Sequence, residues 1–203
     1  MSAAGREVAG LLLAAGAGRR MGLPKAQLRD ARGVPFLDRA VGLLLEGGCA
    51  SVTVVLGAAA DEAVALLDEA GWTGDPAVTV VRAGDWDEGM GASLRQGLAA
   101  LGAGQAGGPV AVLVTLVDLP DVTADVVGRL LAGGAGADTL ARAAYGGEPG
   151  HPVLLGRAHW AGIAEAARGD RGARDYLAQR PVRLVECGDL ATGRDVDRPG
   201  DLA

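Results

Sequence analysis

Short apolar runs alternate with segments of helical periodicity along most of the chain. Four of the runs are rich in Val and Leu, a pattern typical of strands that are covered on both faces. They lie at residues 8–13, 51–56, 78–81 and 110–117. Between the first two, Pro35 begins a helical pattern that continues to Glu46 and is ended by two glycines. Further helices are predicted at 61–70, 92–101, 123–131, 159–168 and 173–179, and further strands at 140–145, 153–155 and 182–187.

The alternation of strands and helices predicts the fold class. It indicates an α/β protein of three layers, α/β/α, in which helices cover both faces of a mostly parallel, Rossmann-like sheet. No repeat or linker interrupts the pattern, so we expect a single domain over residues 1–203, with residues 1–6 flexible. Ligands of such sheets bind at the carboxyl ends of the strands. The segments that follow Leu13, Val81 and Val117 should therefore meet at one edge.

The loop after the first strand carries the strongest chemical signal. Residues 13–25 read Leu-Ala-Ala-Gly-Ala-Gly-Arg-Arg-Met-Gly-Leu-Pro-Lys, and Lys25 is the only lysine in a chain with 19 basic residues. Glycines let backbone N–H groups approach phosphate oxygens, and a lysine offers a compact charge that can follow one oxygen. The spacing does not fit a P-loop, because the second glycine comes late. It does not fit the dinucleotide pattern either, because Met21 stands at the third glycine.

Composition narrows the class of partner. The chain is 49% apolar but only 3% aromatic and has a net charge of −6, which argues against a nucleic-acid-binding surface. Anion binding should be local, because basic residues cluster in and after the loop: Arg19, Arg20, Lys25, Arg29 and Arg32. The apolar run 8–15 is too short to span a membrane, and Cys49 and Cys187 lack metal or redox spacing. We expect a soluble cytoplasmic protein with buried, reduced cysteines and no membrane or nucleic-acid partner.

The loop pattern L-A-A-G-x-G-x-R-M-G-x-x-K resembles the opening motif of the molybdenum cofactor cytidylyltransferases, within the MobA-like NTP transferase superfamily of nucleotidyltransferases. Gly18 stands where that family usually has serine. The resemblance covers nearly the whole chain and continues at 88–98, 117–120, 150–153, 169–174 and 195–202. The last segment departs from the family pattern at Arg198 and Gly200, outside its two aspartates. The resemblance implies the fold of the nucleotide-diphospho-sugar transferases and the activity of a nucleotidyltransferase.

The resemblance also implies roles for particular residues. Lys25, Arg20 and Asp118 would be catalytic, with the basic side chains holding the triphosphate and a metal on Asp118 polarising the α-phosphoryl oxygen. His151, in a Gly-His-Pro segment, is a candidate contact to the acceptor, whereas His159 is expected to be structural. The nucleotide-binding set would be Leu13, Ala14, Ala15, Gly16, Ala17, Gly18, Arg19, Arg20, Met21, Gly22, Lys25, Gly91 and Ser93.

Three aspartates are candidate metal ligands. Asp118 ends an almost wholly apolar run, where a carboxylate is costly unless it is paired, and Mg²⁺ is a natural partner. Asp195 and Asp197 alternate about Val196, so their carboxylates should point to the same side of an extended chain. Two alternatives stay open. Asp118 could instead begin a turn or cap the next helix, and one of the other two could cap a helix before Pro199.

By resemblance, the reaction is the transfer of CMP from CTP to the terminal phosphate of molybdopterin, with Mg²⁺ as cofactor and pyrophosphate as product. A molybdoenzyme or its maturation chaperone would be a protein partner. Ala15 favours CTP over GTP, because its methyl group would narrow a base pocket that GTP-using relatives widen with glycine. The alternatives are guanylyl transfer to the same pterin and nucleotidyl transfer to phospholactate or a sugar 1-phosphate. A non-catalytic nucleotide or cofactor carrier is the alternative of a different class.

Overall fold

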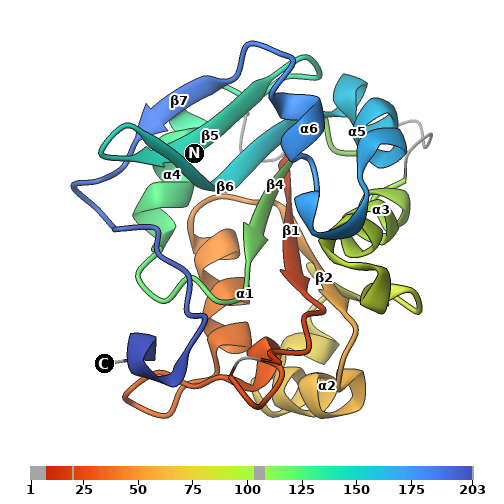
Figure 1. Ribbon diagram of the computed structural model, residues 1–203, viewed down its shortest axis with the longest axis vertical. Helices are drawn as coiled ribbons and strands as arrows, with labels where there is room; N and C mark the ends of the chain where they lie inside the picture. Colours follow the sequence, from red (N-terminus) through yellow and green to blue (C-terminus); the bar gives the residue numbers. More distant parts are fainter. Residues whose placement is uncertain (1–7, 20, 103–107, 203) are drawn as a thin grey trace.

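A seven-stranded sheet forms the centre of the computed structural model, which describes residues 8–19, 21–102 and 108–202 (Figure 1). The strands are β1 (Val8–Ala14), β2 (Ser51–Leu56), β3 (Val78–Arg82), β4 (Ala111–Leu116), β5 (Leu140–Tyr145), β6 (Glu148–Gly156) and β7 (Arg183–Glu186). Their order is β3-β2-β1-β4-β6-β5-β7, and only β6 runs antiparallel to its neighbours. The prediction of a mostly parallel α/β sheet is confirmed. The expectations for residues 1–6 and for Arg20 fall outside the described residues.

Helices cover both faces of this sheet and give the three layers expected from the sequence (Figure 1). They are α1 (Phe36–Glu46), α2 (Ala60–Glu69), α3 (Met90–Ala100), α4 (Ala124–Ala132), α5 (Trp160–Ala166) and α6 (Arg174–Leu177). Apolar residues of α1, α2 and α4 share a core with one set of alternating strand residues, such as Leu12 and Val54. Those of α3 and α5 share a second core with the other set, such as Leu11 and Val55.

The strands follow the sequence prediction more closely than the short helices do. β2 and β5 have the predicted bounds. β6 begins at Glu148, well before the predicted residue 153, because Gly146 and Gly147 both have positive φ and form a tight turn that pairs it with β5. α5 ends at Ala166 rather than at residue 168, since the backbone becomes extended at Ala167.

The central strands β1 and β4 bring two chemically important segments together. The two strands are parallel neighbours, and beyond their paired residues the Val117 N–H donates to the Leu13 carbonyl at 3.2 Å. The glycine loop and Asp118 therefore leave the sheet side by side. β3 ends at the same edge and leads through the short 3₁₀ helix η4 (Trp86–Glu88) into α3. The three segments expected at this edge do meet there.

The cysteines are placed as the composition suggested. Cys49 and Cys187 are both free, buried thiols, and burial raises the pKa of Cys49 to about 12. No helix in the described ranges has the length and apolar character needed to cross a membrane.

Candidate active site

The glycine loop turns sharply around Gly18. The N–H groups of Met21 and Gly22 both donate to the Gly18 carbonyl, at 2.8 and 3.0 Å. Gly18 has a φ of +58°, and a Cβ at this position would lie 1.8 Å from the carbonyl oxygen of Leu23. Only glycine fits this path of the chain, so a side chain at position 18 would force the loop to shift. The Met21 side chain is buried in the core that β1 shares with α1, so it anchors the loop.

A cleft of about 340 Å³ opens beside this loop, at the carboxyl ends of β1 and β4. Its walls are formed by the three segments that follow β1, β3 and β4, as the sequence predicted, and by the segment at Asp170. Eight residues predicted for the site line it: Leu13, Ala15, Gly16, Ala17, Arg19, Lys25, Ser93 and Asp118. This cleft is hereafter called the nucleotide cleft.

The other residues predicted to bind nucleotide lie around the nucleotide cleft rather than in its wall. Gly18 and Met21 border an adjoining depression with Asp197. Ala14 is the last residue of β1, and Gly22 lies in the turn with a φ of +79°. Gly91 faces the backbone of residues 167–168, where an added Cβ would lie 2.9 Å from the Ala167 carbonyl carbon. Arg20 lies outside the described residues.

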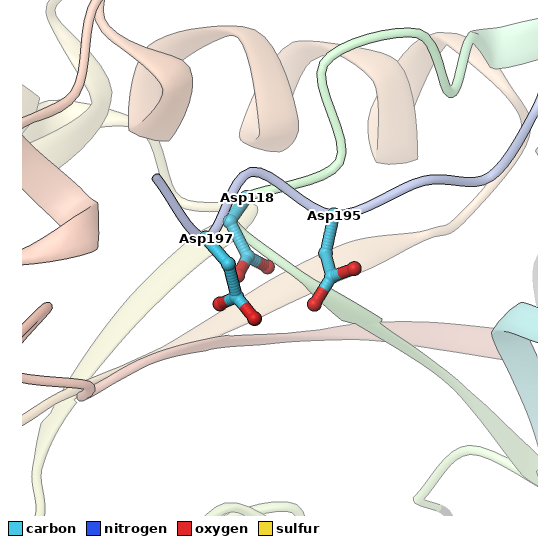
Figure 2. Close-up of side chains that lie close together, drawn as sticks. All are labelled: Asp118, Asp195 and Asp197. Carbon is cyan, nitrogen blue, oxygen red and sulfur yellow. The ribbon is translucent and has the colours of Figure 1, made fainter. Parts of the chain in front are cut away.

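Figure 2 shows the carboxylates of Asp118, Asp195 and Asp197 directed to the same side, from two segments far apart in the sequence. One oxygen of each lies within 4.8 Å of the others. Asp118 is only 4% exposed at the end of β4. The other two flank Val196, which is buried and whose N–H donates to the Asp118 carbonyl at 2.9 Å. This contact, which we call the Val196 clasp, places the carboxylates of Asp195 and Asp197 beside Asp118.

Lys25 lies among these carboxylates. Its Nζ donates to Asp118 Oδ2 and, at 2.7 Å, to Asp197 Oδ1. Burial opposes the charge of Lys25, but the hydrogen bonds to the two carboxylates outweigh it and raise the pKa of the ammonium. Burial also raises the pKa of Asp118, against the lowering effect of Lys25. When all four groups are ionised, three carboxylates and one ammonium carry two net negative charges, which equals the charge of one divalent cation.

Three residues of the nucleotide cleft were not singled out from the sequence. Trp86 and Asp87 line the cleft from η4, and Asp170 lines it from the 3₁₀ helix η6 (Gly169–Arg171). η6 packs on Gly89, where a Cβ would lie 2.6 Å from the Gly169 carbonyl carbon. Gly89 has a φ of +110°, and this packing, together with the contact of Gly91 with residues 167–168, holds Asp170 at the cleft. No local pattern could have shown the contact, because the two segments are distant in sequence.

The candidate acceptor residue His151 lies in a second cleft, which we call the acceptor cleft. Its backbone is fixed on β6, where the Tyr145 hydroxyl donates to the His151 carbonyl at 2.6 Å. Burial, with the charges of Arg142 and Arg174, lowers the pKa of His151 to about 4, so the imidazole is neutral at pH 7. His159 instead contacts the Tyr176 hydroxyl and the Asp138 carbonyl, in keeping with the structural role expected for it.

Comparisons with known proteins place this geometry in context. Residues 10–184 match the MobA-like NTP transferase domain. A protein of Paenarthrobacter nicotinovorans named nicotine blue oxidoreductase is 37% identical over 94% of this chain and 92% of its own length. A probable molybdenum cofactor guanylyltransferase of Opitutus terrae is 32% identical over 91% of this chain and 87% of its own. Among solved structures, a Mycobacterium tuberculosis protein in complex with manganese superimposes with a TM-score of 0.68 at 24% identity, covering 94% of each chain.

Proposed function

Because the chain belongs to the MobA-like NTP transferase family, whose activity is nucleotidyl transfer, we propose that it transfers CMP from CTP to the terminal phosphate of molybdopterin. Pyrophosphate is the second product. The observation that carries the proposal is the meeting, in one cleft, of a glycine loop, the only lysine of the chain and a buried carboxylate. The pterin acceptor is supported by the name of the Opitutus relative, which specifies the molybdenum cofactor.

The three aspartates fit a divalent metal, and we propose Mg²⁺. Mg²⁺ prefers oxygen ligands and is usually held by one or two carboxylates together with phosphate oxygens and water. Asp118, Asp195 and Asp197 offer three oxygens close together, with a net charge, after Lys25, that one divalent ion neutralises. The manganese complex of the mycobacterial protein supports metal use on this fold. When bound, the ion would withdraw electrons from phosphoryl oxygens of the nucleotide.

The chain's own residues then position the reactants and balance charge. Backbone N–H groups of the loop around Gly16 and Ala17, with the side chain of Arg19, bind the triphosphate. Lys25 follows the charge that builds on the leaving pyrophosphate. An oxygen of the acceptor phosphate forms a bond to the α-phosphorus, and the bond from that phosphorus to the bridging oxygen breaks. No protein nucleophile is required, since the acceptor phosphate is one itself.

The choice of CTP rests on two residues that line the nucleotide cleft, Ala15 and Trp86, and on their close packing against Gly57. A Cβ on Gly57 would lie 2.8 Å from the Ala15 methyl carbon and 2.5 Å from Trp86 Cβ, so the three residues are tightly packed. Ala15 and Trp86 both line the cleft. A pyrimidine needs less room here than a purine does. The Opitutus relative is named for guanylyl transfer, so GTP is the competing substrate.

The experiment is a panel of nucleoside triphosphates and phosphorylated acceptors, with pyrophosphate release measured in the presence of MgCl₂. We expect kcat/KM for CTP to exceed that for GTP by about 10- to 100-fold, the range of a methyl-sized discrimination. Ala15→Gly should reduce this ratio. Preference of the wild type for GTP would contradict the cytidylyl assignment. If the wild type prefers CTP and Ala15→Gly leaves the ratio of kcat/KM values unchanged, residues other than Ala15 cause the preference.

Two other functions are tested by the same preparation. Phospholactate and sugar 1-phosphates belong in the acceptor panel, and a carrier would bind nucleotide without metal-dependent pyrophosphate release. The Paenarthrobacter relative is named as an oxidoreductase, so NADH oxidation with nicotine blue is a separate assay. Activity in that assay without pyrophosphate release would replace nucleotidyl transfer as the function.

A further inference from the structure

The acceptor cleft is built from β5, β6, the start of α6 and the C-terminal segment. Arg142 on β5, His151 on β6 and Arg174 at the start of α6 all line it. It shares Met90, Leu116 and Asp170 with the nucleotide cleft, so the two clefts are continuous. The lining residues other than these are Leu119, Pro149, Gly150, Arg171, Ala173, Gly193 and Asp195.

Two of the arginines that line this cleft are Arg142 and Arg174. Arg142 is partly buried, and its Nε donates to the Gly150 carbonyl at 3.1 Å, which fixes the base of the guanidinium against β6. Within the described ranges, no ion pair joins Arg142 or Arg174 to a carboxylate. Arg171 in the same cleft behaves differently, because it pairs with Asp175 at 2.7 Å.

The charge of Arg174 acts on Arg142, and the charges of both arginines act on His151. Burial and the charge of Arg174 lower the pKa of Arg142, and both arginines contribute to the low pKa of His151. A second positive charge in the same cleft is costly for a partly buried guanidinium such as that of Arg142, because it raises the free energy of the charged form. A bound anion would remove that cost.

We propose that Arg142 and Arg174 bind the phosphate group of the acceptor, a dianionic phosphate monoester. The inference rests on the proposed nucleotidyl transfer and assigns the end of the acceptor that this cleft recognises. Two guanidinium groups match the charge of such a dianion, and their planar forks bind two oxygens each with charge-assisted hydrogen bonds. His151, neutral beside them, adds a hydrogen bond from its ring.

The placement of acidic groups orients the acceptor. Asp170 lines both the acceptor cleft and the nucleotide cleft. Asp195 lines the acceptor cleft and also belongs to the cluster of three carboxylates. A phosphate held by the arginines therefore has the nucleotide cleft on its other side. One of its oxygens forms the bond to the α-phosphorus, and the electron pair of the broken bond leaves with pyrophosphate.

The test compares Arg142→Gln and Arg174→Gln with a matched control, Arg180→Gln. Arg180→Gln also removes one positive charge. It serves as the control because the Arg180 guanidinium lies over the Tyr176 ring and does not line the acceptor cleft. In steady-state assays of pyrophosphate release, each cleft variant should raise the KM for the acceptor by about tenfold or more. The KM for CTP should stay within about twofold in all three proteins, and Arg180→Gln should match the wild type.

A direct binding measurement separates this inference from the proposed function. The probe is phenyl phosphate, titrated by ligand-observed NMR without nucleotide. Arg142→Gln and Arg174→Gln should weaken binding by about tenfold, whereas Arg180→Gln should retain it, because Arg180 does not line the acceptor cleft. Unchanged phenyl phosphate binding and acceptor KM in both arginine variants would overturn the inference. Absence of pyrophosphate release from the wild type with every acceptor would overturn the proposed function. The phenyl phosphate titration would then be the sole test of whether Arg142 and Arg174 bind a phosphate group.

Discussion

At the scale of single residues, Lys25 contacts two carboxylates, Asp118 and Asp197, in addition to the phosphate contact that the sequence suggested. Its place in a glycine loop predicted a contact to phosphate, and the structure adds an ion pair with Asp118, which is 4% exposed. Position on a loop would suggest that Lys25 matters only for turnover. The contact with a buried carboxylate gives it a role in stability as well, because an unpaired buried charge is strongly destabilising.

Lys25→Ala should lower the rate of pyrophosphate release by about 100- to 1000-fold, the usual effect of removing one group that stabilises developing charge. Lys25→Arg should restore little of it, because a planar fork cannot replace a compact ammonium. Lys25→Ala should also lower the melting temperature, and Lys25→Ala with Asp118→Asn should recover part of that loss. Full activity of Lys25→Arg would show that the compact charge is unimportant.

His151 gives the protein a pH-dependent stability. Its folded pKa is about 4, below the ordinary 6.5, so the unfolded chain binds more protons between these values. The contribution of neutral His151 is therefore complete above pH 6.5 and is lost as the pH falls toward 4, by about 3 kcal/mol in total. Urea unfolding at pH 7 and pH 5 should show a smaller loss on acidification for His151→Gln than for the wild type. Equal losses in the two proteins would mean that His151 titrates normally.

At the scale of elements, the strands and the meeting of their carboxyl ends were predictable, whereas the packing of the 3₁₀ helix η6 against the start of α3 was not. β1, β2 and β4 are buried on both faces, so their apolar runs mark them directly. α6 has only four residues and depends on its packing rather than on its own periodicity. In the candidate site, Asp118 was predictable because a carboxylate ends an apolar strand. Asp170 was not, because its place depends on the contact of η6 with Gly89.

The approach of α3 to the backbone of residues 167–168 offers a test at this scale. Gly91→Ala would place a Cβ 2.9 Å from backbone atoms of Ala167 and Arg168, which cannot yield as a flexible side chain does. We expect a loss of about 1–3 kcal/mol of stability, more than the gain in helix propensity. Gly128→Ala in α4 is the matched control. Its nearest contact would be at 3.7 Å, so it should gain up to about 1 kcal/mol. Equal effects in thermal unfolding would show that α3 can shift freely.

At the scale of the whole molecule, the candidate metal site joins the middle of the chain to its C-terminal segment. Asp118→Asn removes the most buried of the three carboxylates. Addition of MgCl₂ with CTP should raise the melting temperature of this variant less than that of the wild type, because the metal has lost one of its ligands. Without metal, the variant should be at least as stable, since less negative charge is crowded together. A variant stabilised by MgCl₂ and CTP as strongly as the wild type would exclude Asp118 as a ligand.

The Val196 clasp has a consequence for the order in which a growing chain acquires its chemistry. The sheet strands through β6 and the glycine loop are made before the tail that carries Asp195 and Asp197. A chain still short of residue 195 can fold much of the nucleotide cleft while it holds only one of the three carboxylates. By the proposed mechanism, unfinished chains would bind a triphosphate without consuming it. The reaction would then begin only when residues 195–197 have been made and Val196 contacts Asp118.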